Sequence, residues 1–299
     1  MPTRLLPVLL ALAVLGSTSA VAARGIGTGD AARYQNTPGW HGLVQRTALD
    51  VVGIPTSAGT FSATDWTLIG GTLAATALLS FPLEGGSLDV RALRRIREWL
   101  GPAHLRIWSH SRDVFIYAGI ALATGGLFAY GLITKQPAYV ESATLMLESF
   151  AVSEVFHLVL KLATGRQCIF DGRGLGLYEG PAGSLKHFPC GTPSGHVASI
   201  MALVGTLTRF WQSPILDVVL GAIVLFFSAT IVADDYHYLS EVLIGAAMGY
   251  GIGRWVTDQR SSQYRDTPDG ASVVAVRGKP SVWTSSDGSP PTFSFRFPF

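Results

Sequence analysis

Six long apolar stretches constrain the fold of this chain more than any other feature. A helix that fully spans a bilayer needs about 20 apolar residues, and several of the stretches are shorter or carry a charge, such as Asp217 or Glu148. Ionisable groups inside such helices usually face the bundle interior. The pattern therefore predicts an all-α, six-helix bundle that is partly embedded in lipid. The stretches cover residues 66–82, 114–134, 138–163, 196–211, 215–233 and 239–256.

The composition supports a membrane protein. Of the 299 residues, 48% are hydrophobic and only 14% are charged, whereas a typical soluble domain carries roughly 25% charged residues. The formal net charge of +2, without a basic stripe that alternates with aromatic residues, argues against nucleic-acid binding. A soluble or peripheral periplasmic bundle with a very apolar core is the alternative.

The N-terminus has the pattern of a secretory signal peptide. Arg4 supplies the positive charge, residues 5–16 form an apolar run, and Ala20-Val21-Ala22 is a small-residue cleavage pattern. We expect a cleaved signal over residues 1–23, with an uncleaved first span as the alternative.

The rest of the chain divides into three predicted parts. Residues 24–60 are expected to form a lead-in segment with one short helix, and residues 61–257 form the helical domain. Residues 258–299 are polar and rich in Ser, Gly and Pro, which predicts an irregular tail. The alternating phenylalanines at its end have the period of a strand, but one strand cannot form a membrane barrel.

Two connections between the apolar stretches are long. Residues 83–112 contain six arginines and a predicted short amphipathic helix at 90–100. Residues 164–195 are rich in Gly and Pro, and loops of this length in compact proteins are often functional. The second connection contains Cys168 and Cys190, which either pair in an oxidising compartment or remain free thiols.

Three clusters of polar side chains lie at predicted helix ends. The spacings of three and four residues in the first cluster place its members on one helix face. The second cluster stands where a helix begins, and the third pairs a histidine with a carboxylate one turn later. The clusters are Glu154, His157 and Lys161; Thr192-Pro193-Ser194-Gly195-His196; and His237 with Glu241.

The second and third clusters suit phosphate chemistry. A Ser-Gly pair at a helix start presents free backbone N–H groups, which favour anions. His196 beside it can donate a proton to a leaving oxygen, and a carboxylate next to His237 can fix the imidazole tautomer for nucleophilic attack. With Lys161 as a positive charge for the phosphate oxygens, these parts describe phosphoryl transfer through a phosphohistidine, with no metal or other cofactor required.

Pro193-Ser194-Gly195-His196, flanked by Lys161 and by His237 with its acidic partner, resembles the type 2 phosphatidic acid phosphatase superfamily, which also contains the vanadium haloperoxidases. Members share a helical bundle and the motifs K-x6-R-P, P-S-G-H and S-R-x5-H-x3-D. The resemblance covers residues 60–256. It implies that His237 attacks phosphorus, that Glu241 orients His237 and that His196 protonates the departing alcohol. The residues it expects to hold the phosphate oxygens are Lys161, Ser194 and the backbone of Gly195.

Two motifs depart from the family pattern. Cys168-Ile169 stands where the family has Arg-Pro, and Ile231, or Thr230 with a one-residue shift, stands where it has an arginine. Those arginines neutralise the transferring phosphoryl group, and guanidinium forks make strong contacts to it. The candidate substitutes in the same loop are Arg166, Arg173 and Lys186.

The resemblance implies hydrolysis of a phosphomonoester or pyrophosphate, either on a lipid or on a small molecule. One alternative is a non-catalytic descendant that binds phospholipid or acts as a structural membrane protein. A second is a metal site, because Glu154-x-x-His157 has the spacing of di-iron bundles, although a di-iron site needs this pattern twice. A vanadate-dependent haloperoxidase is a third.

The resemblance also implies a multi-pass protein of a bacterial inner membrane, with a site that faces the periplasm. The arginines of residues 83–112 conflict with this orientation, since such loops are usually cytoplasmic. A bond between Cys168 and Cys190 would favour the outward orientation.

Overall fold

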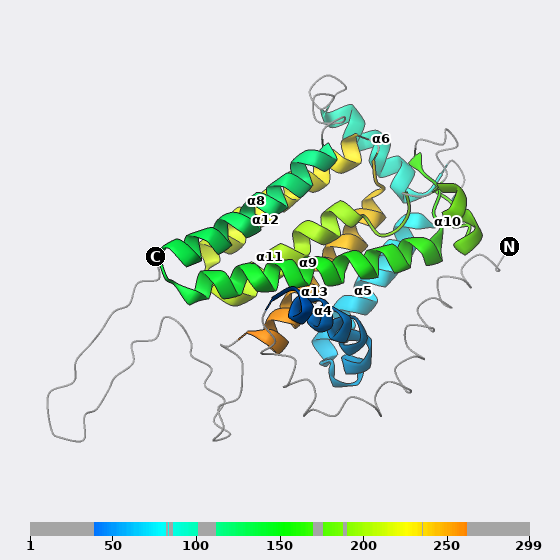
Figure 1. Cartoon of the computed structure of the whole chain (residues 1–299). Helices are drawn as coiled ribbons and strands as arrows, with labels where there is room; N and C mark the ends of the chain where they lie inside the picture. Colours follow the sequence, from blue (N-terminus) through cyan, green and yellow to red (C-terminus); the bar gives the residue numbers. More distant parts are fainter. Residues whose placement is uncertain are drawn as a thin grey trace, which may run out of the picture. The chain divides into compact units, whose positions relative to one another are not determined.

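The computed structural model describes residues 39–81, 83, 86–100, 112–169, 176–187, 190–234 and 236–261. These residues fold almost entirely into helices, with one isolated β-bridge between Arg166 and Tyr178 (Figure 1). The expected signal peptide and the tail beyond residue 261 lie outside the described residues. The predicted all-α class is confirmed.

Each of the six apolar stretches forms a helix at the predicted place. Helix starts follow capping chemistry, since the Ser213 hydroxyl accepts a hydrogen bond from the Leu216 amide just before Pro214. The six helices are α5 (Ala63–Ser80), α8 (Arg112–Ile133), α9 (Pro137–Thr164), α11 (Gly195–Trp211), α12 (Pro214–Ala233) and α13 (Leu239–Arg260).

Four further elements join these helices: α4 (Gly39–Thr56), the 3-10 turn η2 (Ser57–Thr60), α6 (Leu88–Leu100) and α10 (Pro181–His187). α6 confirms the predicted amphipathic helix, and α10 lies within the long Gly- and Pro-rich connection of residues 164–195. α4 is longer than the short helix expected in the lead-in. It packs against α9 and α13, so the helical domain includes residues from Gly39 onward.

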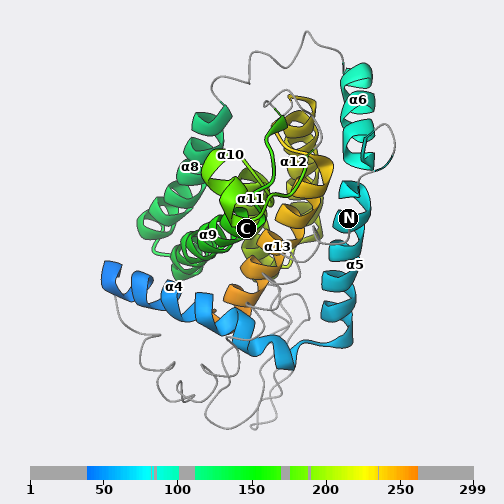
Figure 2. The same cartoon turned by 90° about the vertical axis from the view of Figure 1, so that its right-hand side faces the viewer.

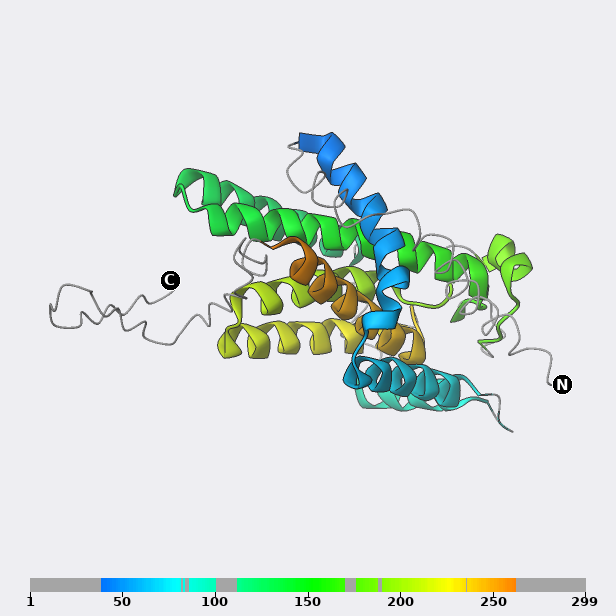
Figure 3. The same cartoon turned by 90° about the horizontal axis from the view of Figure 1, so that it is seen from below.

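α11 lies at the centre of the helical domain and packs most extensively against α13 and α9. Figure 2 shows α11, α12 and α13 between the α8–α9 pair and the α5–α6 pair. α4 crosses α9 and α13 obliquely (Figure 3). Buried ion pairs hold this crossing, since Arg260 pairs with Asp50 and Arg46 Nε lies 3.1 Å from Glu148 Oε2. The predicted inward orientation of Glu148 is confirmed, whereas Asp217 is exposed in the first turn of α12.

α13 approaches α11 closely because glycines face α11 at successive turns. A Cβ at Gly249 would overlap the backbone carbonyl oxygen of Ala198, and a Cβ at Gly253 would overlap that of Ala202. Small residues at a four-residue spacing allow helix backbones to approach in this way. The contact sets the separation of the two helices.

α8, α9 and α12 are each long and apolar enough to cross a membrane. The side chains of α8 and α12 point largely outward, and Leu122, Ile133 and Leu225 are among the most exposed apolar groups. The interior is more polar, because Ser149 of α9 and Thr206 of α11 are buried and share a hydrogen bond of 2.8 Å. Apolar side chains on the outside and polar side chains in the interior are typical of helices that are surrounded by lipid.

The Gly249→Ala variant is expected to unfold at a lower temperature than the wild type. The added methyl group must push α13 away from the Ala198 carbonyl, and overpacking of this kind costs roughly 1–3 kcal/mol. Thermal unfolding of the purified protein in detergent measures the effect. Gly251→Ala is the matched control, because its Cβ would meet nothing within 4 Å. Equal loss of stability in both variants would contradict the close-packing account.

Candidate active site

The end of α9 and the starts of α11 and α13 meet at one end of the helical domain. The Ser194 amide donates to the backbone oxygen of Glu241 at 3.0 Å, and the Thr164 hydroxyl donates to the backbone oxygen of Thr192 at 3.0 Å. A Cβ at Gly245 would lie 2.7 Å from the Ser194 oxygen, so glycine permits this approach. The three polar clusters of the sequence therefore come together.

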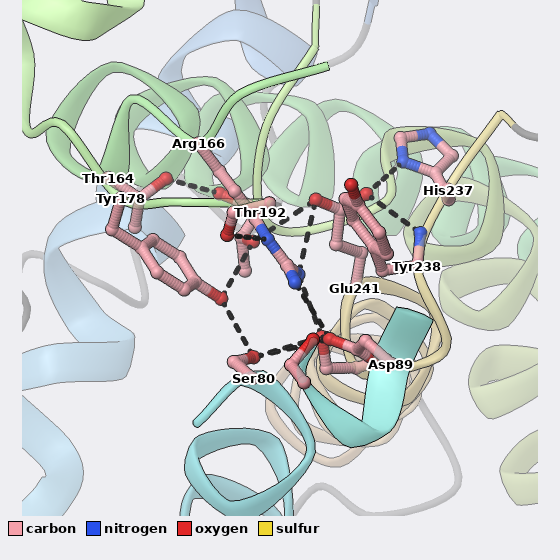
Figure 4. Close-up of polar contacts among 12 residues, drawn as sticks. Ser80, Asp89, Thr164, Arg166, Tyr178, Thr192, His237, Tyr238 and Glu241 are labelled. Carbon is pink, nitrogen blue, oxygen red and sulfur yellow. Dashed lines mark hydrogen bonds and ion pairs between the residues drawn. The ribbon is translucent and has the colours of Figure 1, made fainter. Parts of the chain in front are cut away.

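His237 and Glu241 form a buried pair at the start of α13 (Figure 4). Nδ1 of His237 lies 2.6 Å from Oε2 of Glu241, and the same oxygen accepts from the Tyr238 amide at 3.3 Å. A carboxylate accepts but does not donate, so the ring proton lies on Nδ1. The Nε2 atom then keeps a lone pair, which a nucleophilic imidazole requires.

His196 follows in the first turn of α11, close to His237. The centroids of the two imidazole rings are 6.1 Å apart. Tyr236 lies beside both rings, and Tyr117 of α8 contacts His196 with ring centroids 5.8 Å apart. The structure thus brings the two predicted catalytic histidines together and adds two tyrosines that the sequence interpretation missed. Neither tyrosine belongs to a motif, so the sequence pattern did not point to them.

The loop before α11 ends in a buried N-cap residue, Ser194. Ser194 is fully buried and caps α11, since its hydroxyl oxygen accepts from the Val197 amide at 3.5 Å. The first N–H groups of a helix, which here begin at Gly195, have no acceptor within the helix. Lys161 is buried in the last turn of α9, and its Cγ is the atom nearest to the Cβ position of Gly191, at 3.6 Å.

Arg166, which was expected to contact phosphate, lies in a buried network of ion pairs. Its side chain is completely buried, and Nη2 donates to Asp89 Oδ2 at 2.7 Å. Nη1 lies 3.3 Å from Oε1 of Glu241, and the guanidinium stacks on Tyr238 at 4.2 Å. These partners place Arg166 behind the carboxylate of Glu241. Its position makes it a support for the His237–Glu241 pair.

Asp89 and Ser240 complete this buried network, and neither residue belongs to a motif that could have pointed to it. Ser240 of α13 donates to Asp89 through its amide at 2.9 Å and its hydroxyl at 2.5 Å. Arg166 also donates to the Ser240 hydroxyl oxygen at 2.7 Å. Figure 4 shows the continuous path from Asp89 through Arg166 and Glu241 to His237. The start of α6 is thereby tied to the candidate nucleophile.

Burial and charge shift the pKa values of two groups in this network. Burial raises the pKa of Tyr238 to about 12, so its hydroxyl stays protonated. Burial acts to lower the pKa of Arg166, but Tyr178, Glu241 and Asp89 outweigh it and raise the pKa above its ordinary value. The guanidinium therefore remains charged beside Glu241.

The two positions where motif arginines were expected have structural partners. Cys168 forms a disulfide with Cys190, and their Cα atoms are 5.3 Å apart. The question that the sequence left open is thus resolved in favour of pairing. Ile231 is fully buried in an apolar cluster, and its backbone oxygen accepts from the Tyr236 amide at 3.1 Å. Ile231 thereby shapes the turn that carries His237.

Among the described residues, no group of three or more His, Cys, Asp or Glu side chains has an arrangement that could hold a metal ion. Glu154 and His157 form a pair in α9, with His157 Nδ1 3.2 Å from Glu154 Oε2. The described part of the chain therefore offers no support for the di-iron alternative.

Asp89→Ala is expected to lower the free energy of unfolding by about 3–5 kcal/mol, because it leaves the guanidinium of Arg166 buried without its carboxylate. Denaturation of the detergent-solubilised protein measures this loss. Glu98→Ala on the same helix is the control, since its pair with Arg95 is exposed and such pairs contribute at most about 1 kcal/mol. Similar losses in the two variants would contradict the assigned network.

Comparison with known proteins agrees with this geometry. Residues 142–265 match the family described as the PAP2 superfamily. No curated protein and no solved structure matches the chain. The matched region contains both histidines, Glu241, Lys161 and the Ser194–Gly195 loop, and the match supports a phosphatase-like protein in broad terms. The match supports membership of this helical region in the PAP2 (type 2 phosphatidic acid phosphatase) superfamily.

Proposed function

We propose that the protein hydrolyses a phosphate ester through a phosphohistidine at His237. The observation that carries the proposal is the hydrogen bond of 2.6 Å between His237 Nδ1 and Glu241, because it fixes the tautomer in which Nε2 carries the lone pair. The nearby His196 ring supplies the proton donor that the departing alcohol needs.

The reaction has two displacement steps. In the first, Nε2 of His237 forms a bond to phosphorus, the bond to the ester oxygen breaks, and His196 gives its proton to the leaving alcohol. In the second, the now neutral His196 takes a proton from water, and the hydroxide formed attacks phosphorus. The P–N bond then breaks, its electron pair returns to Nε2, and inorganic phosphate leaves while His196 is again protonated. No metal or redox partner enters the balance.

Arg166 and Asp89 act in this scheme as positioning residues. The guanidinium of Arg166 lies beside the buried carboxylate of Glu241, and Asp89 compensates its charge from the other side. A carboxylate that remains charged can stabilise the positive imidazole that forms during attack, as in other nucleophile–base arrangements. Phosphate binding is assigned to Lys161, the Ser194 hydroxyl and the Gly195 amide.

We propose a phosphorylated lipid as the substrate class. The exposed apolar side chains of α8 and α12 suit a lipid environment, and the site lies at one end of the same helices. Exposed arginines on α6, among them Arg94 and Arg95, lie at this end and can attract anionic headgroups. A small soluble phosphomonoester is the alternative substrate.

The non-catalytic alternative has one observation in its favour. Cys168 is tied up in a disulfide at the position of a family arginine, so that position offers no cation to a phosphate. The loss of a single preorganised donor can cost about 10²–10³ in rate. Activity measurements separate an impaired enzyme from a protein that only binds phospholipid.

His237→Ala is expected to abolish hydrolysis of p-nitrophenyl phosphate and of phosphatidate, with a loss of at least about 10³ in kcat, because the nucleophile is absent. Phosphate release by purified protein in detergent measures it. Lys135→Gln, in the exposed turn before α9, is the control and should keep wild-type turnover. Turnover that persists in His237→Ala, or a wild type without any turnover, would reject the proposal.

We further propose that the site faces an oxidising compartment such as the bacterial periplasm, because the Cys168–Cys190 disulfide closes the loop beside it. Labelling of intact cells tests this orientation. After reduction, a membrane-impermeant maleimide should modify both cysteines, which are the two cysteines of the chain. Labelling that requires cell lysis would place the loop in the cytoplasm and overturn this orientation.

A further inference from the structure

A third histidine, His157 of α9, lies against the start of α11. A Cβ at Gly195 would lie 2.8 Å from His157 Nε2, 3.0 Å from its Cδ2 and 3.2 Å from its Cε1. These three atoms form the ring edge that is farthest from the α9 backbone. The Nε2 edge of the imidazole therefore faces the first residue of α11.

Glu154 holds the opposite side of this ring. Its Oε2 lies 3.2 Å from Nδ1 of His157, and its Oε1 accepts a hydrogen bond from the Ser199 hydroxyl of α11. Ser199 also lies 2.8 Å from the backbone oxygen of Gly195, so the carboxylate is fixed to the same helix turn. The carboxylate lies at ion-pair distance from Nδ1, without a hydrogen bond to it, and its charge favours a proton on that atom. Nε2 is directed toward Gly195.

Lys161 follows His157 by one turn on the same face of α9. Lys161 contacts the loop near Gly191, and His157 contacts it near Gly195. The two basic side chains therefore flank the loop at its two ends. Arg166, by contrast, is directed into the buried network with Asp89 and Glu241. The loop thus receives basic groups from α9 and not from Arg166.

We propose that His157, held by Glu154, is a phosphate-binding residue whose Nε2 contacts a phosphate oxygen seated on the first N–H groups of α11. The inference rests on the hydrolase proposed above. Protonated His157 donates to a phosphate dianion, and neutral His157 accepts from a monoanion. Either contact is charge-assisted and stronger than one between neutral groups. Glu154 acts as the positioning residue that orients the imidazole.

Binding of inorganic phosphate to the purified full-length protein, measured by calorimetry, tests this assignment together with kcat and KM for p-nitrophenyl phosphate. His157→Gln keeps a neutral donor near the position of Nε2, and His157→Leu keeps none. Glu154→Gln removes only the orienting charge. Lys135→Gln removes a positive charge from the turn at the other end of α9 and is the control. Thermal unfolding of each variant reports any structural role separately.

We expect phosphate affinity to fall roughly 10- to 100-fold in His157→Leu and by less in His157→Gln, since hydrogen bonds to charged groups have this strength. As phosphate affinity falls, KM for p-nitrophenyl phosphate should rise, and kcat should change less. Lys135→Gln should match the wild type in all three quantities. Unchanged affinity and KM in His157→Leu would overturn the role of His157. The hydrolase proposal would then still stand if the wild type turns over and His237→Ala does not. A wild type that neither binds phosphate nor turns over contradicts both.

Discussion

The buried carboxylate of Glu241 is the group on which the rest of the site depends. One oxygen lies 2.6 Å from His237 and the other lies 3.3 Å from Arg166. An unpaired charge at this depth would be strongly unfavourable, so the carboxylate requires the guanidinium. The guanidinium in turn requires Asp89, which joins α6 to the loop after α9 and to α13. The contacts around this one carboxylate therefore fix the positions of three chain segments.

Close helix packing gives this charge network its geometry. Glycines on α13 let its backbone touch α11 along three turns, which brings Ser194 onto the backbone of Glu241. The first turns of α11 and α13 then hold His196 and His237 with ring centroids 6.1 Å apart. The same contact sets the fold and the spacing of the proposed acid and nucleophile. Outside this core, α8 and α12 present apolar surfaces that suit lipid.

Much of the fold could be predicted because apolar stretches are local signals, and the three motifs identified the helix ends that meet. The role of Arg166 could not be predicted, since it depends on Asp89, which lies 77 residues earlier in the chain and belongs to no motif. The pairing of Cys168 with Cys190 depends on a backbone path that spacing alone does not define. The length of α4 was underestimated because Asp50 and Arg46 interrupt its apolar pattern. Their ion-pair partners lie on α13 and α9.

If His237 is the nucleophile, the phosphoryl group forms a covalent bond to its Nε2 atom during turnover. Rapid quenching of the purified protein with excess ³²P-labelled phosphatidate or p-nitrophenyl phosphate, followed by peptide mapping under alkaline conditions, tests it most directly. One acid-labile phosphoryl group is expected on the peptide that contains His237, and it should form and decay at rates compatible with turnover. Turnover without any phosphorylated histidine, or label on a different residue, would exclude His237 as the nucleophile.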